Sequence, residues 1–422
     1  MTLPAKFVER VLCDLGEAEG RALCAALDGV PPVSVRVNPA KAAADALSAL
    51  EIAGQVPWCR DGRYLAVRPS FTLDPDFHAG AYYVQEASSQ FVGHLLEGVR
   101  TEGARILDLC AAPGGKTTLY ASLAGPGGLV VANEIDRRRA AVLADNVRKW
   151  GTGNVAVTTC EPRMLGDFEA WFDIVAVDAP CSGEGMFRKD CEARGEWSEG
   201  SVKLCAARQN GILREAWRAL KPGGTLVYST CTFNRDEDEG ALERMLAWAG
   251  DEVAESDEIA VEDAWGIVCG RVGAFRTFRF YPHRACGEGF FAAVARKSFD
   301  AGGRARTPKA RRTVFAAADR KTSAELARWV REPDRMCFAQ VADTFYAWYA
   351  AQADAVRALS EALPVICSGV ALGQVFKGTL KPDPALALLD RLNRGAVPVA
   401  ELDEVEALRY LRKQEIAAAG LA

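Results

Sequence analysis

The central part of the chain alternates between short, almost wholly apolar runs and longer amphipathic segments. Strands are predicted at residues 104–112, 128–134, 154–160, 172–180, 225–232 and 289–297. Helices are predicted at residues 82–99, 116–125, 136–151, 201–224 and 234–250. Apolar strands that alternate with amphipathic helices are typical of a parallel sheet covered by helices on both faces. We therefore expect an α/β domain of the doubly wound type.

Shorter signals on both sides of this domain predict two flanking regions. A helical pattern at residues 4–28 and the strand-like "VSVRVNP" precede it, and mixed helix and strand patterns follow it. The whole chain has 422 residues, of which 49% are hydrophobic and 25% charged, enough for two or three globular domains. The predicted division is a small N-terminal α/β module (1–80), a main domain (81–298), a basic linker (299–320) and a C-terminal domain (321–422).

The charge distribution is more informative than the net charge. The formal net charge of −5 argues weakly against a nucleic-acid partner. Residues 296–321, however, contain nine basic and two acidic side chains. Such a segment is either a solvated linker between domains or an arm that contacts phosphates, and both readings stay open.

The cysteines and histidines do not resemble a disulfide framework or a zinc site. The thirteen cysteines are scattered without a C-x-x-C pair, and there are three histidines, His78, His94 and His283. We predict reduced, mostly buried thiols and no metal. The acidic start of the chain is unlike a signal peptide, and no apolar run reaches the length of a membrane span, so a cytoplasmic location is predicted.

The first strand of the main domain ends in "DLCAAPGGKTT", which predicts a ligand site. Gly114 and Gly115 allow a ligand to approach the backbone closely at the start of the next helix. The dinucleotide motif G-x-G-x-x-G is absent, and a Walker A loop would need glycine where Cys110 stands. Glu134, after the next strand, is placed to bind both ribose hydroxyls, and Glu161, after the third, to face an adenine. This pattern fits S-adenosylmethionine (SAM).

Two thiols follow the fourth and fifth predicted strands. Cys181 comes after Asp178-Ala-Pro, and Cys231 lies in "YSTCT". If these strands are neighbours, both thiols face one pocket beside the cofactor's methyl group. A thiolate that adds to C6 of a cytosine activates C5 for methylation, a carboxyl group stabilises the developing charge, and a second thiol can assist release. A helix expected from Asn234 mildly favours Cys231 as the nucleophile without deciding between the thiols.

The motifs "DLCAAPGGKTT", "DAPCSGEG", "RKD" and "YSTCT" together resemble the Nop/Sun family of RNA cytosine-C5 methyltransferases. A longer match, which includes "VQEASSQ" and "HRACGEGFF", makes the chain similar to bacterial members of this family that modify ribosomal RNA. It implies a Rossmann-like class I SAM-dependent methyltransferase fold, with Cys231 as nucleophile, Cys181 in product release, Asp178 on the cytosine and Lys189 near the base or a phosphate. The SAM-binding residues it implies are Cys110, Ala111, Ala112, Pro113, Gly114, Gly115, Lys116, Glu134 and Asp178, with Glu161 in a Glu-Pro sequence where the family usually has Asp-Gly.

The resemblance also implies roles for the flanking regions. Residues 369–388 are similar to a PUA-like RNA-binding domain of bacterial relatives, in which Lys377, Lys381 and the arginines of the basic linker would meet phosphates. The alternative is a domain that serves packing alone. In the N-terminal module, Arg36 and Asn38 of "VRVNP" are candidates for contact with RNA. The implied partner is 16S ribosomal RNA within the small ribosomal subunit, and the protein is expected to act as a monomer.

Two other functions are compatible with the sequence. A DNA cytosine-C5 methyltransferase would use the thiol after proline, here Cys181, as its nucleophile. A non-catalytic RNA-binding ribosome-assembly factor could retain the SAM fold. A nicotinamide-dependent oxidoreductase is disfavoured because its glycine motif is absent.

Overall fold

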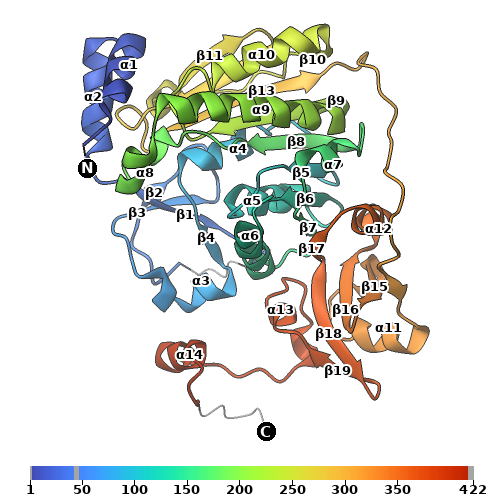
Figure 1. The fold of residues 1–422 in the computed structure, drawn as a ribbon. Coiled ribbons are helices and arrows are strands. Elements are labelled where there is room, and N and C mark those ends of the chain that lie inside the picture. Colours follow the sequence, from blue (N-terminus) through green and yellow to red (C-terminus); the bar gives the residue numbers. More distant parts are fainter. Residues whose placement is uncertain (1, 42–46, 417–422) are drawn as a thin grey trace.

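The chain folds around one long mixed sheet. In the computed structural model, which describes residues 2–41 and 47–416, the strand order of this sheet is β11-β12-β13-β9-β8-β5-β6-β7-β17 (Figure 1). The strands are β5 (Arg105–Asp108), β6 (Leu129–Asn133), β7 (Val155–Thr158), β8 (Phe172–Asp178), β9 (Leu220–Thr230), β11 (Val268–Val272), β12 (Phe275–Phe280), β13 (Phe290–Lys297) and β17 (Val365–Ser368). β7, β6, β5, β8 and β9 are mutually parallel, as predicted, and this is the Rossmann-like arrangement.

Helices bury both faces of the sheet. Successive residues of β5 point to opposite sides: Ile106 lies in the core under α4, α5 and α6, and Leu107 in the core under α9, α10 and α12. These helices are α4 (Phe91–His94), α5 (Gly115–Ala124), α6 (Arg137–Trp150), α9 (Glu199–Ala219), α10 (Glu239–Ala249) and α12 (Ala353–Ala362). Short helices α7 (Pro162–Gly166) and α8 (Cys191–Glu196) and strand β10 (Val253–Ala254) complete the domain.

The prediction of one helix over residues 82–99 is wrong. Tyr82–Val84 forms strand β4, which pairs with β1, and the α-helix is confined to Phe91–His94. Between them, the Glu86 carboxylate accepts hydrogen bonds from the backbone N–H groups of Ser88 and Ser89. Side-chain acceptors of this kind compete with helical hydrogen bonds, which a periodicity pattern does not register.

The N-terminal module consists of a helical hairpin and a small antiparallel sheet. The helices are α1 (Ala5–Leu15), α2 (Glu17–Leu27) and α3 (Pro75–Ala79), and the sheet order β2-β3-β1-β4 comprises β1 (Val33–Val37), β2 (Ile52–Gln55), β3 (Gly62–Leu65) and β4. Phe7 and Leu23 of the hairpin pack against Phe187 and Phe233 of the main domain. The hairpin therefore supports the loops that follow β8 and β9.

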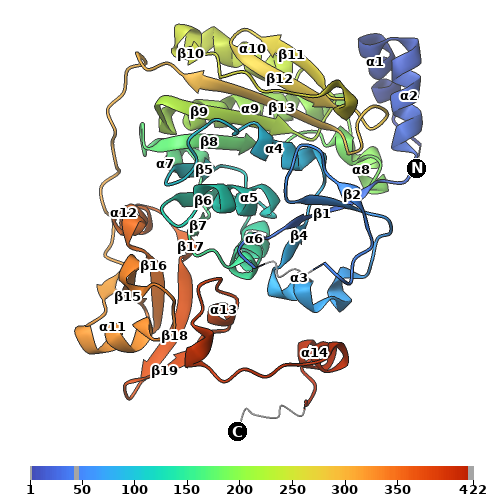
Figure 2. The same cartoon turned by 180° about the vertical axis from the view of Figure 1, so that it is seen from behind.

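The C-terminal region forms a second sheet and also extends the first. Its own sheet, in the order β14-β15-β16-β18-β19, comprises β14 (Ala316–Ala317), β15 (Met336–Val341), β16 (Thr344–Tyr349), β18 (Val370–Phe376) and β19 (Thr379–Pro382). Helices α11 (Arg320–Ala327) and α13 (Pro384–Ala387) accompany it, and α14 (Glu404–Leu411) lies beside α3 of the N-terminal module. Strand β17, between α12 and β18, instead pairs with β7 of the main sheet (Figure 2). The C-terminal region is thus joined to the main domain by a shared sheet. The outermost residues of the predicted terminal domains, 1 and 417–422, lie outside the described residues.

Neither a membrane-spanning helix nor a metal-binding cluster occurs in residues 2–41 and 47–416. No helix there is long and apolar enough to cross a bilayer. No group of three or more histidine, cysteine, aspartate or glutamate side chains is arranged to hold a metal ion in the same residues.

Candidate active site

The loop after β5 forms one wall of a cavity at the carboxyl ends of the parallel strands. Gly114 has a φ of 113°, which glycine adopts with little strain, and α5 begins at the next residue. The first N–H groups of a helix have no partner within the helix, so this turn presents free backbone donors. The turn and the start of α5 therefore suit a ligand that lies close to the backbone.

The cavity has a volume of about 320 Å³. Its walls come from β4, the β5–α5 loop, the segments after β8 and β9, and the start of β13. The lining residues are Tyr83, Val84, Gln85, Glu86, Ser89, Asp108, Cys110, Ala111, Ala112, Pro113, Gly115, Lys116, Asp178, Gly185, Met186, Lys189, Cys231, Glu288, Gly289 and Phe290. Most of the residues predicted to bind SAM or to act in catalysis line this cavity.

The two predicted thiols touch each other. β8 and β9 are adjacent parallel strands with Asp178 opposite Ser229, so the segments that follow them begin side by side. The Sγ atoms of Cys181 and Cys231 lie 3.3 Å apart, and Cys231 faces the cavity. The two thiols thus lie together at one edge of the sheet, but Cys231 lines the cavity and Cys181 lies behind it, so the prediction that both face one pocket holds for Cys231 alone of the two.

The environment distinguishes the two thiols. A hydrogen bond from the Cys181 thiol lowers the pKa of Cys231, and the Lys116 ammonium acts in the same direction against the effect of burial. The pKa of Cys181 lies well above the usual value, because its thiol is the donor to Cys231 and is buried near Glu237, and these effects outweigh a backbone hydrogen bond from Cys231. Within the pair, Cys231 is therefore the more acidic thiol and Cys181 the less acidic one.

The predicted reason for a reactive Cys231 was wrong. Helix α10 begins at Glu239 rather than near Asn234, so its N-terminus is eight positions beyond Cys231. The intervening acids Glu237 and Asp238 turn inward and form hydrogen bonds with Ser182 and Thr230. The neighbouring thiol and lysine, not a helix terminus, favour the Cys231 thiolate.

Asp178 lies between a lysine and a serine at the end of β8. Its Oδ2 is 2.9 Å from the Lys116 Nζ, and the Ser229 hydroxyl donates to its Oδ1 at 2.7 Å. Lys116 is the seventh residue of the predicted SAM loop, yet its side chain reaches the predicted catalytic carboxylate. The Asp178–Lys116 pair thus joins the cofactor side of the cavity to the thiol side.

Lys189 lines the cavity beside a buried glutamate. Its Nζ is 3.9 Å from Glu288 Oε1, while Arg188 donates to Glu288 Oε2 at 3.0 Å. Burial raises the pKa of Glu288 despite the nearby Arg188. Lys189 is thus present at the cavity wall, where sequence reasoning expected it, and Glu288 is a cavity residue that sequence reasoning missed.

Glu134 and Glu161 lie away from this cavity. Glu134 is buried at the end of β6, where its Oε1 accepts from the Asp136 backbone N–H and its Oε2 is 3.3 Å from Arg139. Arg139 also donates to the Ala112 carbonyl at 3.0 Å, which ties Glu134 to the β5–α5 loop. Glu161 is exposed and immediately precedes α7.

Arg36 and Asn38 do not face RNA, contrary to the sequence prediction. Both side chains are buried, and Arg36 donates to the Gln85 and Thr118 side chains, whereas Asn38 donates to the Trp150 carbonyl. They join the N-terminal sheet to the main domain. In a strand flanked on both sides, an alternating polar residue need not point to solvent.

Asp108 is another cavity residue that sequence reasoning missed. It accepts a hydrogen bond from Thr117 at 2.6 Å, and burial raises its pKa to about 7 against that hydrogen bond. An acid at the end of the first parallel strand, just before the glycine turn, is the signal that could have identified it.

Family models and curated relatives agree on one family. Residues 96–296 match the model of the 16S rRNA methyltransferase RsmB/F, and residues 3–87 match the N-terminal domain of the 16S rRNA methyltransferase RsmF. The Ribosomal RNA small subunit methyltransferase F of Shewanella loihica is 33% identical over 408 residues, 91% of this chain and 81% of the relative. The chain belongs to the RsmF family of methyltransferases. The same-named protein of Erwinia tasmaniensis is 37% identical over 278 residues, which are 63% of this chain and 57% of that protein.

Solved structures share the fold. A methyltransferase homologue from Pyrococcus horikoshii superposes with a TM-score of 0.56 and 27% identity, over 70% of this chain and 100% of the homologue. NSun6 from the same organism, solved with SFG, gives a TM-score of 0.59 at 21% identity, over 70% of this chain and 98% of NSun6, and shows the fold alone.

SAM is the cofactor of this RsmF-family enzyme, and the residues fit it. The cavity lies beyond the carboxyl ends of the parallel strands, the usual position of a ligand in such sheets. The Gly114 turn and the first turn of α5 supply backbone donors, and Ala111, Ala112 and Pro113 supply an apolar wall. These residues, with Lys116 and Asp178, would hold the group.

Proposed function

We propose that this chain methylates C5 of a cytidine in 16S ribosomal RNA through a covalent adduct of Cys231. One observation carries the proposal: the Cys231 sulfur faces a cavity that also holds Asp178 and Lys116, and it contacts the Cys181 thiol at 3.3 Å. The names of the relatives, ribosomal RNA small subunit methyltransferase F, support the RNA substrate.

In the proposed reaction, the Cys231 thiolate attacks C6 of the cytosine. The new bond between sulfur and C6 moves electron density to C5 and N3, which makes C5 nucleophilic. Asp178 accepts a hydrogen bond from the amino group of the base, and the Lys116 ammonium, which is paired with Asp178, supplies the positive charge that offsets the electron density on N3. SAM supplies the electrophilic methyl group that C5 takes up.

Release then restores the aromatic base. The C5–H bond breaks, its proton passes to water, and its electron pair forms the C5–C6 double bond. The bond between C6 and sulfur breaks, and its electron pair returns to Cys231. The hydrogen bond from Cys181 stabilises the thiolate that leaves, which is the role we assign to the second thiol.

The target base must leave its stack to reach these groups. Base flipping costs a few kcal/mol, so binding surfaces away from the cavity have to compensate for it. We propose that the C-terminal region is a PUA-like RNA-binding domain. Its β18–β19 hairpin carries the exposed Lys377 and Lys381 next to Phe376, which is 71% exposed. The proposed substrate places the enzyme in the cytoplasm, as a monomer on the small subunit.

A trapping experiment tests the reaction. Wild type, Cys181→Ala, Cys231→Ala and the double variant are each incubated with SAM and small ribosomal subunits, and protein joined to RNA is sought on a denaturing gel. We expect a stable adduct from Cys181→Ala, and none from the two variants that lack Cys231. An adduct that depends on Cys181 instead would favour the DNA-type mechanism. No adduct and no 5-methylcytosine from wild type would favour a binding protein.

A further inference from the structure

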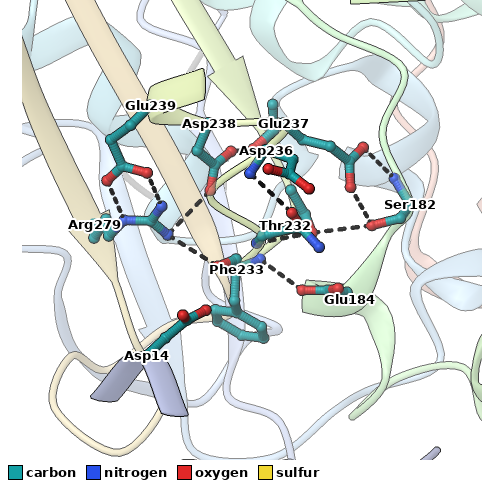
Figure 3. A network of polar contacts seen from close by, with 12 residues as sticks. Asp14, Ser182, Glu184, Thr232, Phe233, Asp236, Glu237, Asp238, Glu239 and Arg279 are labelled. Carbon is teal, nitrogen blue, oxygen red and sulfur yellow. Dashed lines mark hydrogen bonds and ion pairs between the residues drawn. The ribbon is translucent and has the colours of Figure 1, made fainter. Parts of the chain in front are cut away.

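Each of the two thiols is followed by a buried glutamate that binds the loop of the other thiol. Glu237, six residues after Cys231, accepts hydrogen bonds from the Ser182 backbone N–H at 2.8 Å and from the Ser182 hydroxyl at 2.5 Å. Glu184, three residues after Cys181, accepts from the Phe233 backbone N–H at 3.1 Å. Figure 3 shows Glu237 directed at Ser182 and Glu184 directed at Phe233. Each of the two loops is therefore hydrogen-bonded to a glutamate side chain of the other.

Glu237 holds the turn around Cys181 at a second point. Gln209 Nε2 lies 3.2 Å from Glu237 Oε2 and donates to the Pro180 carbonyl at 3.1 Å. Glu237 is itself fixed, because the Tyr228 hydroxyl donates to its backbone carbonyl at 2.6 Å. The residues on both sides of Cys181 are thus attached, directly or through one amide, to a single fully buried carboxylate.

We propose that Glu237 is a positioning residue that fixes the turn from Pro180 to Ser182, so that the Cys181 thiol is directed at the Cys231 sulfur. This inference rests on the proposed thiol chemistry. It assigns a function to an acid that touches neither thiol and does not line the cavity. The nearby Glu239 has no such function, because its carboxylate pairs with Arg279.

The position of Cys231 does not depend on the Glu237 side chain. Cys231 follows β9 directly, and its carbonyl accepts a hydrogen bond from the Gly185 N–H at 2.8 Å. The next residue but one, Phe233, is held by Glu184. Loss of the Glu237 carboxylate should therefore displace Cys181 and leave the nucleophile in place.

Displacement of Cys181 should slow the breakdown of the Cys231 adduct with RNA more than its formation. The Cys181 hydrogen bond stabilises the free Cys231 thiolate, whereas sulfur bonded to C6 is a weak acceptor. Without the hydrogen bond the adduct is favoured over the released thiolate. A Glu237 variant should consequently accumulate the RNA adduct, as Cys181→Ala is expected to do.

An experiment without RNA tests the positioning directly. Alkylation of Cys231 by iodoacetamide is followed against pH, by mass spectrometry of its peptide, in wild type, Glu237→Ala, Glu237→Gln and Glu239→Gln. The groups that face Cys231 are Asp178 and Cys181 after β8, Lys116 on α5, Cys205 on α9, and Glu237. Alanine removes every hydrogen bond of the carboxylate. Glutamine keeps an acceptor for the Ser182 N–H, while the Ser182 hydroxyl can turn to Thr232, 3.1 Å away.

The two substitutions should shift the reactivity of Cys231 in opposite directions. In Glu237→Ala the lost Cys181 hydrogen bond should slow alkylation at neutral pH about tenfold. Both substitutions remove the Glu237 charge, which by itself would favour the Cys231 thiolate, but only Glu237→Gln retains the turn, so its alkylation should be unchanged or faster. Glu239→Gln should match wild type. Alkylation of Glu237→Ala at the wild-type rate would overturn the proposal, whatever the substrate of the enzyme.

The second readout is the decay of the RNA adduct. Measured at a pH above the midpoint of Cys231 alkylation, where every variant holds the thiolate, Glu237→Ala should slow decay about tenfold, the effect of one hydrogen bond to a charged acceptor, with little change in the rate of adduct formation. Ser182→Ala, which removes only the hydroxyl, is a milder variant in case the buried substitution prevents folding, and it should slow decay in the same direction. Equal slowing of formation and decay in both variants would indicate a merely structural role and contradict the proposal.

Discussion

At the scale of single residues, the neighbours of the two cysteine thiols give them different pKa values. Cys231 receives a hydrogen bond and lies near the Lys116 ammonium, and both lower its pKa. Cys181 donates that hydrogen bond and lies near the Glu237 carboxylate, so its pKa is raised. Groups whose environments move their pKa values apart are typical of sites that need one nucleophile and one proton donor.

Asp108 gives a pH-dependent prediction at this scale. Burial raises the pKa of Asp108 in the folded protein to about 7, so between the unfolded pKa of about 4 and this value the native state keeps a proton that the unfolded chain has lost, and the stability falls as the pH rises through this window. The ionisation of Asp108 should therefore lower the free energy of unfolding of the wild type as the pH rises from 5 to 8, and this contribution should be absent from Asp108→Asn. We expect the stability of Asp108→Asn relative to wild type to increase by more than about 1 kcal/mol across this range.

Urea unfolding at pH 5 and pH 8 measures this difference. Asp145→Asn, a change in an exposed carboxylate of α6, is the matched control and should keep the same stability relative to wild type at both pH values. A difference between Asp108→Asn and wild type that does not change with pH would contradict the assignment.

At the scale of elements, the α1–α2 hairpin supports the loops that carry the thiols. The Phe7 ring is fully buried, with its centroid 5.0 Å from that of Phe187 and 6.4 Å from that of Phe233. Arg10 of the same helix donates to Glu184 at 2.6 Å. An N-terminal element distant in sequence thus fixes the segments that follow both β8 and β9.

Phe7→Ala should test this support. A buried Phe→Ala change costs about 3–5 kcal/mol, and here the cavity would open directly beneath the loop at Phe187. We expect a lower melting temperature and slower methyl transfer, measured by circular dichroism and by incorporation of labelled methyl groups. Lys6→Ala, one position earlier with a 65% exposed side chain, should leave both unchanged. A Phe7→Ala protein with wild-type stability would show that the hairpin is not docked in this way.

The sequence predicted the elements of the main sheet because apolar strands between helices leave a strong pattern. The region before β5 was mispredicted because Tyr82–Val84 pairs with β1 and Glu86 accepts from the Ser88 and Ser89 backbone. The start of α10 was mispredicted because Glu237 and Asp238 lie in a turn and bind Ser182 and Thr230, tertiary contacts that the local pattern does not contain. The contact of Cys181 with Cys231 followed from strand order. The burial of Arg36 could not be predicted, since it depends on how the N-terminal sheet packs on α5.

At the scale of the whole molecule, the C-terminal region completes the main sheet and presents a separate basic hairpin. β17 covers the edge of β7, which would otherwise expose unpaired backbone groups. The β18–β19 hairpin projects away from the sheet at the end of the molecule opposite α9 (Figure 1). Under the proposed function, this hairpin would contact RNA at a distance from the cavity and help to offset the cost of base flipping.

The double variant Lys377→Glu/Lys381→Glu should weaken binding to small-subunit ribosomal RNA. Loss of two phosphate contacts should reduce the slope of log affinity against log salt by about two. Filter binding between 50 and 200 mM salt measures this slope. Lys203→Glu/Arg208→Glu on the exposed side of α9 makes the same change in net charge and should have little effect. Equal effects of the two double variants would show that only net charge matters.

The central claim is that Cys231 forms the bond to the target base. RNA that contains 5-fluorocytidine tests it most directly, because fluorine at C5 blocks proton loss and preserves the adduct in the wild-type enzyme. The complex is digested and the modified peptide is located by mass spectrometry. The account predicts the nucleotide on Cys231, with Cys181 unmodified. A nucleotide on Cys181, or on neither cysteine, would contradict it.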